Sequence, residues 1–208
     1  MKNDTINYKG CAIEIIPDQD PMNPRTEWDN LGKMICFHQR YNLGDRKHGF
    51  SDSEELQEFL NANQKTVEIL PLYLYDHSGI TISTGKFSGS WDSGQVGYIY
   101  IDRKTVMENW PNCKQWRKKA IEVMKQEVKT YDDYLTGNVY GFQIMDKEGN
   151  DLNSCFGFYG DPDKSGLMDE AKCSIEYHIQ GQTIKHIKKL KAWIKNNVQL
   201  YEREPFTV

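Results

Sequence analysis

The chain has 208 residues, with 26 Lys and Arg against 30 Asp and Glu, so its formal net charge is −4 at pH 7. General duplex-DNA binders are usually basic overall, and proteins that imitate DNA carry a dense acidic surface, so the whole-chain charge has neither signature. Aromatic residues make up 12% of the chain. This content predicts a folded domain with an aromatic-rich core and excludes a disordered chain.

The cysteines indicate a reducing compartment. They are odd in number and form no CxxC pair: Cys11, Cys36, Cys113, Cys155 and Cys173. Scattered thiols behind a polar N-terminus without a signal peptide are typical of a cytoplasmic protein. No apolar run approaches the roughly 18 residues that span a membrane. The sequence therefore predicts a cytoplasmic protein with no membrane partner.

Strand patterns dominate the first three quarters of the chain. Apolar runs rich in Ile, Val and Tyr, bounded by Gly, Pro, Asn or Asp turns, predict strands. The predicted strands are 8–16, 31–38, 67–75, 80–83, 95–102, 139–145 and 154–159. Short polar loops between neighbouring strands favour antiparallel hairpins.

Apolar residues three or four positions apart predict helices. One spans 51–63 after Ser/Asp caps, and the clearest spans 112–135, where Gly137 can stop it. Two more are predicted near the C-terminus, one from Met168 to Ile179 and one from Ile187 to Tyr201.

The order of these elements predicts the fold class. Strands come as hairpins and helices follow in blocks, which favours α+β over a series of βαβ units. We expect an antiparallel sheet of about six or seven strands with helices packed on one side. The expected domains are an α+β core at 1–161 and a C-terminal helical extension at 162–208 packed on that core.

A candidate acid–base pair follows the strongest strand. Asp76 and His77 lie at its exit, where functional side chains often occur, and a carboxylate can orient an imidazole. Asp92 and His38 are candidates for the same catalytic site, because loops can converge at one sheet edge. The alternative is a polar turn in which Asp76 caps backbone amides before Gly79.

The loop 86–95 is the second candidate. Trp91 and Ser93 lie among glycines and serines that can bring backbone N–H groups onto a phosphate. The chain has neither GxxxxGK[ST] nor GxGxxG, so nucleotide binding lacks a specific motif. Trp91 can instead stack on a base or fill a partner's pocket, and the alternative is a hairpin loop folded over its own Trp.

A third polar cluster flanks strand 31–38. It includes Arg25 and Trp28 before the strand and Arg40 after it. Either arginine can bind a phosphate or carboxylate in bidentate fashion. The alternative is Arg–Asp pairing that holds these loops in place.

Metal and cofactor sites are not predicted. Cys36 and His38 have no second Cys/His pair at zinc-finger spacing. The segment 161–166 resembles the first half of an EF-hand, but Lys172 stands where the loop's last carboxylate belongs.

Two helices have basic faces. The last helix carries Lys188 and Lys189 within a group of five lysines, with no acidic residue between Glu176 and Glu202. Lysines and an arginine also open the helix at 112–135. Clustered Lys and Arg predict contact with nucleic acid or an acidic partner, and a solvated helix face is the alternative.

Several segments carry a resemblance to a known group of proteins. They are DPMNPRTEWDNLGKMICFHQRYNLGD, LPLYLYDHSGITIST, WDSGQVGYIYI, YDDYLTGNVYGF and SCFGFYGD. Together they cover most of residues 11–161, and they resemble a family of uncharacterised proteins from bacteriophages and mobile elements. The resemblance implies no fold, activity or catalytic residue. It implies genomic company in which proteins of this size often act as anti-defence factors, including inhibitors of CRISPR effectors.

Two functional hypotheses follow, and the alternative to both is a structural or regulatory phage protein with no site at all. The first is a phage-encoded accessory protein in the host cytosol that binds a host protein or ribonucleoprotein complex. Its contact surface would combine Trp28, Trp91 and the 76–93 loops, with the basic helix adding nucleic-acid contact. The second is an enzyme acting on a nucleotide or nucleic acid through the His and Asp candidates.

Overall fold

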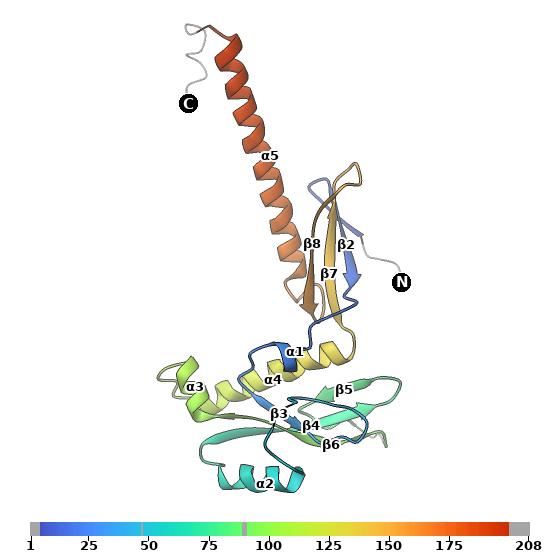
Figure 1. Ribbon diagram of the computed structural model, residues 1–208, viewed down its shortest axis with the longest axis vertical. Coiled ribbons are helices and arrows are strands. Elements are labelled where there is room, and N and C mark those ends of the chain that lie inside the picture. Colours follow the sequence, from blue (N-terminus) through green and yellow to red (C-terminus); the bar gives the residue numbers. More distant parts are fainter. Residues whose placement is uncertain (1–4, 47, 89–90, 200–208) are drawn as a thin grey trace. The chain divides into compact units, whose positions relative to one another are not determined.

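The chain folds into two units, each built on its own four-stranded antiparallel sheet (Figure 1). This computed structural model describes residues 5–46, 48–88 and 91–199, so the predicted helix residue Tyr201 lies outside it. The central unit comprises Pro17–Val139 and Tyr159–Asp161, and the terminal unit comprises Met1–Ile16, Tyr140–Phe158 and Pro162–Val208. The α+β class is confirmed, and the expected single sheet of six or seven strands is corrected to two sheets of four.

The central sheet has the strand order β3-β6-β4-β5. Its strands are β3 (Lys33–Cys36), β4 (Val67–Asp76), β5 (Ile80–Ser83) and β6 (Ser93–Asp102). Every neighbouring pair is antiparallel. The hairpin around loop 76–80 is therefore formed by β4 and β5. The expectation that strands 80–83 and 95–102 are neighbours is wrong, because β6 pairs with β4 and not with β5, and β3 lies at the outer edge of β6.

Helices cover both faces of the central sheet. Helix α4 (Trp116–Leu135) packs on one face, where Met124 and Val128 join Leu72 and Ile99 in the core. Helix α2 (Ser53–Ala62) lies on the other face, and its apolar residues contact the side chains that β4 and β6 present there (Figure 1). The expectation of helices on one side is therefore wrong for this unit, because both faces of its strands are apolar.

Capping residues explain the helix boundaries. Asp52 accepts hydrogen bonds from the backbone N–H groups of Glu54 and Glu55 and so begins α2. Asp102 caps α3 (Arg103–Asn109) in the same way, a helix that the apolar pattern did not predict. The one-turn helix α1 (Pro24–Glu27) begins at Asn23, whose side chain accepts from the N–H of Arg25. Gly137, with φ +73°, follows the end of α4.

The terminal sheet has the order β1-β2-β7-β8. Its strands are β1 (Thr5–Tyr8), β2 (Cys11–Pro17), β7 (Val139–Met145) and β8 (Asp151–Tyr159). The predicted strand 8–16 is in fact part of a hairpin, because Lys9 and Gly10 both adopt positive φ and turn the chain between Tyr8 and Cys11.

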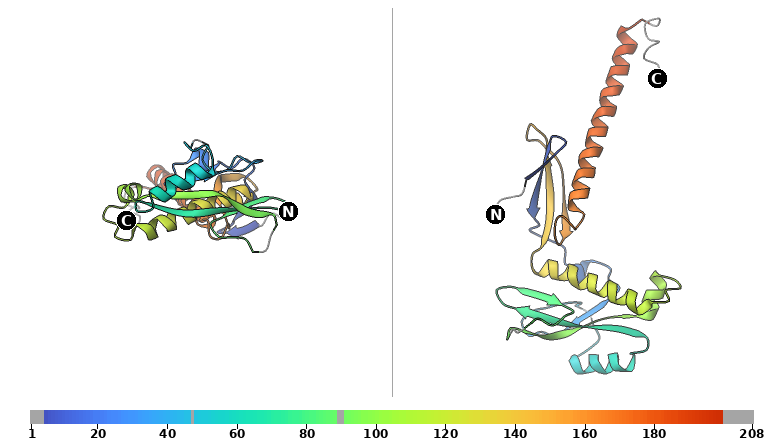
Figure 2. Two further views of the ribbon diagram at one scale, coloured as in Figure 1. Left: turned by 90° about the horizontal axis from the view of Figure 1, so that it is seen from below. Right: turned by 180° about the vertical axis from the view of Figure 1, so that it is seen from behind.

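A single helix, α5 (Leu167–Asn197), replaces the two predicted C-terminal helices. Leu167, Ala171 and Ile175 pack into the core of the terminal sheet. Beyond them α5 continues past the ends of its own strands (Figures 1 and 2). The terminal unit thus joins α5 with strands from 1–16 and 140–158, so its composition does not follow the domain boundary expected at residue 161.

The hydropathy of the helices bears on membrane insertion. Within the described ranges, none of them combines the length and the apolar character that crossing a bilayer requires.

Two glycines on β6 offer a matched test of sheet packing. A Cβ at Gly97 would clash with the carbonyl oxygen of Ile35 on β3 and lie 2.9 Å from the Cα of Cys36, whereas at Gly94 no described atom lies within 4 Å. We expect Gly97→Ala to lower the free energy of unfolding by at least about 2 kcal/mol, because β3 must move away. Gly94→Ala should change it by less than about 0.5 kcal/mol. Urea denaturation followed by tryptophan fluorescence measures both, and equal stabilities for the two variants would contradict the described β3–β6 packing.

Candidate functional site

Three strand ends of the central sheet meet at one place. Because β3–β6 and β6–β4 are antiparallel, the ends of β3 and β4 lie beside the start of β6, as the pairs Cys36↔Gly97 and Tyr75↔Ser93 show. We call the open hollow there, of about 550 Å³, the strand-end hollow. Its lining residues are Phe37, His38, Gln39, Arg40, Leu74, Asp76, Trp91, Asp92, Ser93, Gly94, Gln95 and Val96.

The strand-end hollow brings together most of the predicted site residues of the central unit. Those that line it are His38, Arg40, Asp76, Trp91, Asp92 and Ser93. They come from three segments up to 55 positions apart in the sequence, and only the sheet register joins them. Catalytic and binding candidates thus share one surface.

Asp76 is held in a fixed set of contacts. Its carboxylate forms an ion pair with Arg40 and accepts a hydrogen bond from the hydroxyl of Tyr41 at 3.3 Å. The guanidinium of Arg40 lies 5.5 Å from the centre of the Tyr41 ring. The Asp76 side chain is 19% exposed and that of Arg40 is 69% exposed. Asp76 therefore positions Arg40 at the surface, where the guanidinium remains accessible to a partner.

His38 acts as a local cap. Its Nδ1 accepts hydrogen bonds from the backbone N–H groups of Arg40 and Tyr41, both at 3.2 Å. Its ring also stacks on Tyr41 with centroids 5.0 Å apart. Since Nδ1 accepts, the neutral ring carries its proton on Nε2. His38 therefore fixes the turn after β3, and Nδ1 is not free to act as a base.

His77 and Asp92 form an imidazole–carboxylate pair, with Nδ1 and Oδ2 3.2 Å apart. Their side chains are 64% and 51% exposed, so water screens the interaction. Asp92 lines the strand-end hollow, whereas His77 is not among the described residues that line it. The pair can exchange a proton with solvent or with a ligand bound at the rim.

Trp91 and Trp28 are in different surroundings. The Trp91 side chain is fully exposed, at 103% of its reference area. Trp28 packs edge-on against Tyr159, with ring centroids 4.9 Å apart, and is 42% exposed. Trp28 is not among the described residues that line the strand-end hollow. The expected surface that joins both tryptophans is therefore not formed around the hollow.

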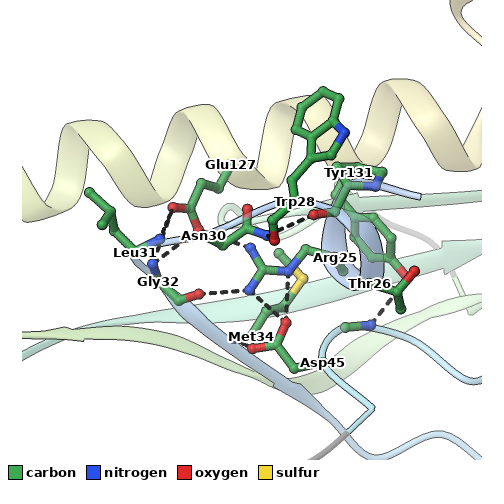
Figure 3. Close-up of polar contacts among 12 residues, drawn as sticks. Arg25, Thr26, Trp28, Asn30, Leu31, Gly32, Met34, Asp45, Glu127 and Tyr131 are labelled. Carbon is green, nitrogen blue, oxygen red and sulfur yellow. Dashed lines mark hydrogen bonds and ion pairs between the residues drawn. The ribbon is translucent and has the colours of Figure 1, made fainter. Parts of the chain in front are cut away.

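Arg25 is an interior residue, 5% exposed, and not a surface anion site. Its Nε and Nη2 donate to Asp45 Oδ1 at 2.9 and 2.6 Å, Nη1 donates to Glu127 Oε2 at 2.9 Å, and Nη2 donates to the carbonyl of Gly32 at 2.6 Å (Figure 3). This corrects the expected binding role, and the alternative of Arg–Asp pairing that holds the loops is confirmed.

Asp45 and Glu127 were not singled out from the sequence. Asp45 Oδ2 accepts from the N–H of Met34 at 2.9 Å, and Glu127 Oε1 accepts from the N–H groups of Leu31 and Gly32 (Figure 3). Glu127 lies 102 positions from Arg25 and follows the pattern of a solvated helix face, so no local signal identifies it. Asp45 lies in the polar loop that follows strand 31–38, and the alternative of Arg–Asp pairing is the sequence signal that points to it.

The lysines of the basic helix belong to the other unit. Lys188 and Lys189 are exposed on the second half of α5. The predicted site residues therefore divide between the two units, with the catalytic candidates and Trp91 in the central one.

The Cys36 thiol and the arrangement of metal-ligating side chains bear on which reactions the site can support. Burial raises the pKa of the Cys36 thiol to about 12, so this thiol stays protonated and is a poor nucleophile. Across residues 5–46, 48–88 and 91–199, no three His, Cys, Asp or Glu side chains are arranged to hold a metal ion. The described hollow supplies hydrogen bonds, one exposed cation and one exposed aromatic ring.

The buried ion pairs of Arg25 and the exposed ion pair of Arg40 allow a test of how burial affects stability. Arg25→Ala leaves Asp45 and Glu127 without their counter-ion beside the core, and we expect a loss of about 3–5 kcal/mol in the free energy of unfolding. Arg40→Ala breaks an exposed pair and should cost less than about 1 kcal/mol. Urea denaturation measures both. A loss below 1 kcal/mol for Arg25→Ala would show that the buried network is not needed for stability.

Comparisons with known proteins give no further guide to the site, since no family model, curated protein or solved structure matches the chain.

Proposed function

We propose that this protein is a phage-encoded accessory protein that binds a host macromolecule through the strand-end hollow. The partner is a protein surface in a nucleic-acid-handling defence complex, and the binding inhibits or redirects that complex. The observation that supports binding is the complete exposure of Trp91 at the rim of a polar hollow.

Trp91 has the properties of an interface anchor. An aromatic side chain of this size buries about 150–250 Å² when covered, and its truncation at the centre of an interface typically costs about 2 kcal/mol or more. Within its own fold the ring gains little from burial, because it is fully exposed. Trp, Tyr and Arg are the residues that most often dominate binding energy, and Arg40 and Tyr41 lie on the same end of the sheet.

The charges at the hollow favour a protein over a nucleic-acid backbone. Asp76 and Asp92 line the hollow beside Arg40, and carboxylates repel phosphate groups. A protein surface can present both signs of charge to such a site. The nucleic-acid contact expected through Lys188 and Lys189 would involve a different unit and remains a prediction.

The identity of the host partner rests on the sequence. The segments between residues 11 and 161 resemble phage and mobile-element proteins, and this genomic setting suggests defence complexes as targets. The exposed Trp91 supports the act of binding, and the resemblance supports the class of partner.

A pull-down from phage-infected host cells, read by mass spectrometry, tests this proposal. We expect the tagged chain to retain a host protein, and Trp91→Ala to weaken that complex by at least roughly thirtyfold without lowering the unfolding temperature. Met22→Ala is the control, since Met22 is 59% exposed in the same unit and does not belong to the described lining of the hollow. Retention of the same partner by wild type and Trp91→Ala alike would contradict the proposal.

A second candidate function is an enzyme acting on a nucleotide or nucleic acid. The observation in its favour is the His77–Asp92 pair at the rim of the hollow. Asp92 would hold the imidazole while Nε2 of His77 exchanges a proton with substrate. The exposure of both groups argues for a weak catalyst, because water competes at every contact.

This second candidate predicts turnover that depends on His77. The purified chain would be incubated with nucleotides and with single- and double-stranded nucleic acids, and products separated by chromatography. His77→Ala should abolish product formation, and Asp92→Asn should reduce it by roughly 100-fold or more. Glu58→Gln on α2 serves as a control, because Glu58 is exposed like His77 and Asp92. Unchanged turnover in His77→Ala would exclude this mechanism.

A further inference from the structure

The second half of α5 carries a large exposed apolar face. Ile184, Ile187, Leu190 and Trp193 are 46%, 44%, 46% and 58% exposed. Among the described residues, no hydrophobic cluster includes an α5 side chain beyond Ile175. A single helix without tertiary contacts is only marginally stable in water, so this segment gains most from a surface that covers it.

The spacing of these residues makes the apolar face wide. Each of these side chains follows the previous one by three residues. Three residues rotate a helix by about 300°, so each side chain lies about 60° around the helix from the one before it. From Ile184 to Trp193 the apolar side chains therefore spread over roughly half of the circumference. A helix in a coiled coil or in a groove needs only a narrow apolar stripe. A helix that lies on a flat apolar surface buries about half of its circumference.

Positive charge borders this face on both sides. At about 100° per residue, Lys188, Lys191 and Lys195 fall along one border, and Lys189 falls beside Trp193 on the other. The sequence has no Asp or Glu between Glu176 and Glu202. Lysines can extend their amines outward from a buried apolar face, and a Trp ring suits the boundary between apolar and polar surroundings.

We propose that residues 184–194 of α5 lie on an anionic membrane surface. The apolar face enters the boundary between headgroups and acyl chains, and the lysines contact the acidic headgroups. The helix does not cross the bilayer. The criterion that excluded a membrane from the sequence concerned spanning segments only, and a helix that lies along the surface does not need an apolar run of that length.

Other partners fit this face less well. A second copy would bring two lysine-bordered helices together with no acidic side chain in this segment to pair them. A nucleic acid would engage the lysines but leave Ile184, Ile187 and Leu190 in water. Both partners remain distinguishable by experiment.

Vesicle flotation of the full chain tests the proposal, with pure phosphatidylcholine vesicles compared with equal parts of phosphatidylcholine and phosphatidylserine. We expect binding to the anionic vesicles only, with a blue shift of tryptophan emission as Trp193 leaves water. Leu190→Glu keeps good helix propensity and should weaken binding at least about tenfold. Replacing the bordering Lys188, Lys191 and Lys195 by Gln should weaken it roughly 100-fold.

A matched control removes the same charge elsewhere. Lys114, just before α4, and Lys118 and Lys125 on α4 are exposed, and their replacement by Gln should leave vesicle binding within about twofold. Absence of wild-type binding to the anionic vesicles would overturn the proposal. So would a dimer in analytical ultracentrifugation that Leu190→Glu dissociates, or binding to duplex DNA that needs the α5 lysines but tolerates Leu190→Glu.

Discussion

The buried guanidinium of Arg25 is the interaction on which the central unit depends. It donates hydrogen bonds to Asp45, to Glu127 and to the carbonyl of Gly32. Asp45 lies in a loop, Glu127 lies on α4, and Gly32 directly precedes β3. A buried charge that loses its partners costs several kcal/mol, so these three parts of the chain are held in one arrangement. Since Glu127 also accepts from the N–H groups of Leu31 and Gly32, α4 fixes the point at which β3 begins.

This constraint reaches the strand-end hollow through the segment between β3 and Asp45. The N–H of Phe37 donates to the carbonyl of Val96 at 2.7 Å, and the N–H of Asp45 donates to the carbonyl of Met34 at 2.8 Å. Both ends of this segment are therefore attached to the sheet. His38 caps its turn, and the Arg40–Asp76 pair ties its middle to the end of β4. A buried ion pair thus supports one wall of a surface that presents Arg40 and Trp91 to solvent.

Local patterns were enough to predict most strands and the β4–β5 hairpin, because a short turn brings consecutive strands together. The pairing of β6 with β4, which brings Asp92 to the end of the sheet that holds His38 and Asp76, does not follow from loop spacing. Local patterns were not enough for the sheets. Whether β7 and β8 join the strands of the central unit or the N-terminal hairpin depends on pairing partners more than a hundred positions away, which alternation along one strand does not specify. Glu127 was missed for the same reason, since its spacing on α4 matches a solvated face and only the fold brings it to Arg25.

Helix α5 shows a different limit of sequence periodicity. A repeat of apolar residues establishes that a helix has an apolar face, but not what covers it. Leu167, Ala171 and Ile175 are four residues apart and stay on the side that meets the terminal sheet. From Ile184 onward the steps shorten to three, so the apolar face turns. The C-terminal part of α5 also extends past the ends of its strands (Figure 2). The prediction that this extension packs on the core assumed that the cover lies in the same chain. The bordering lysines and the lack of Asp or Glu between Glu176 and Glu202 point to an anionic surface outside it.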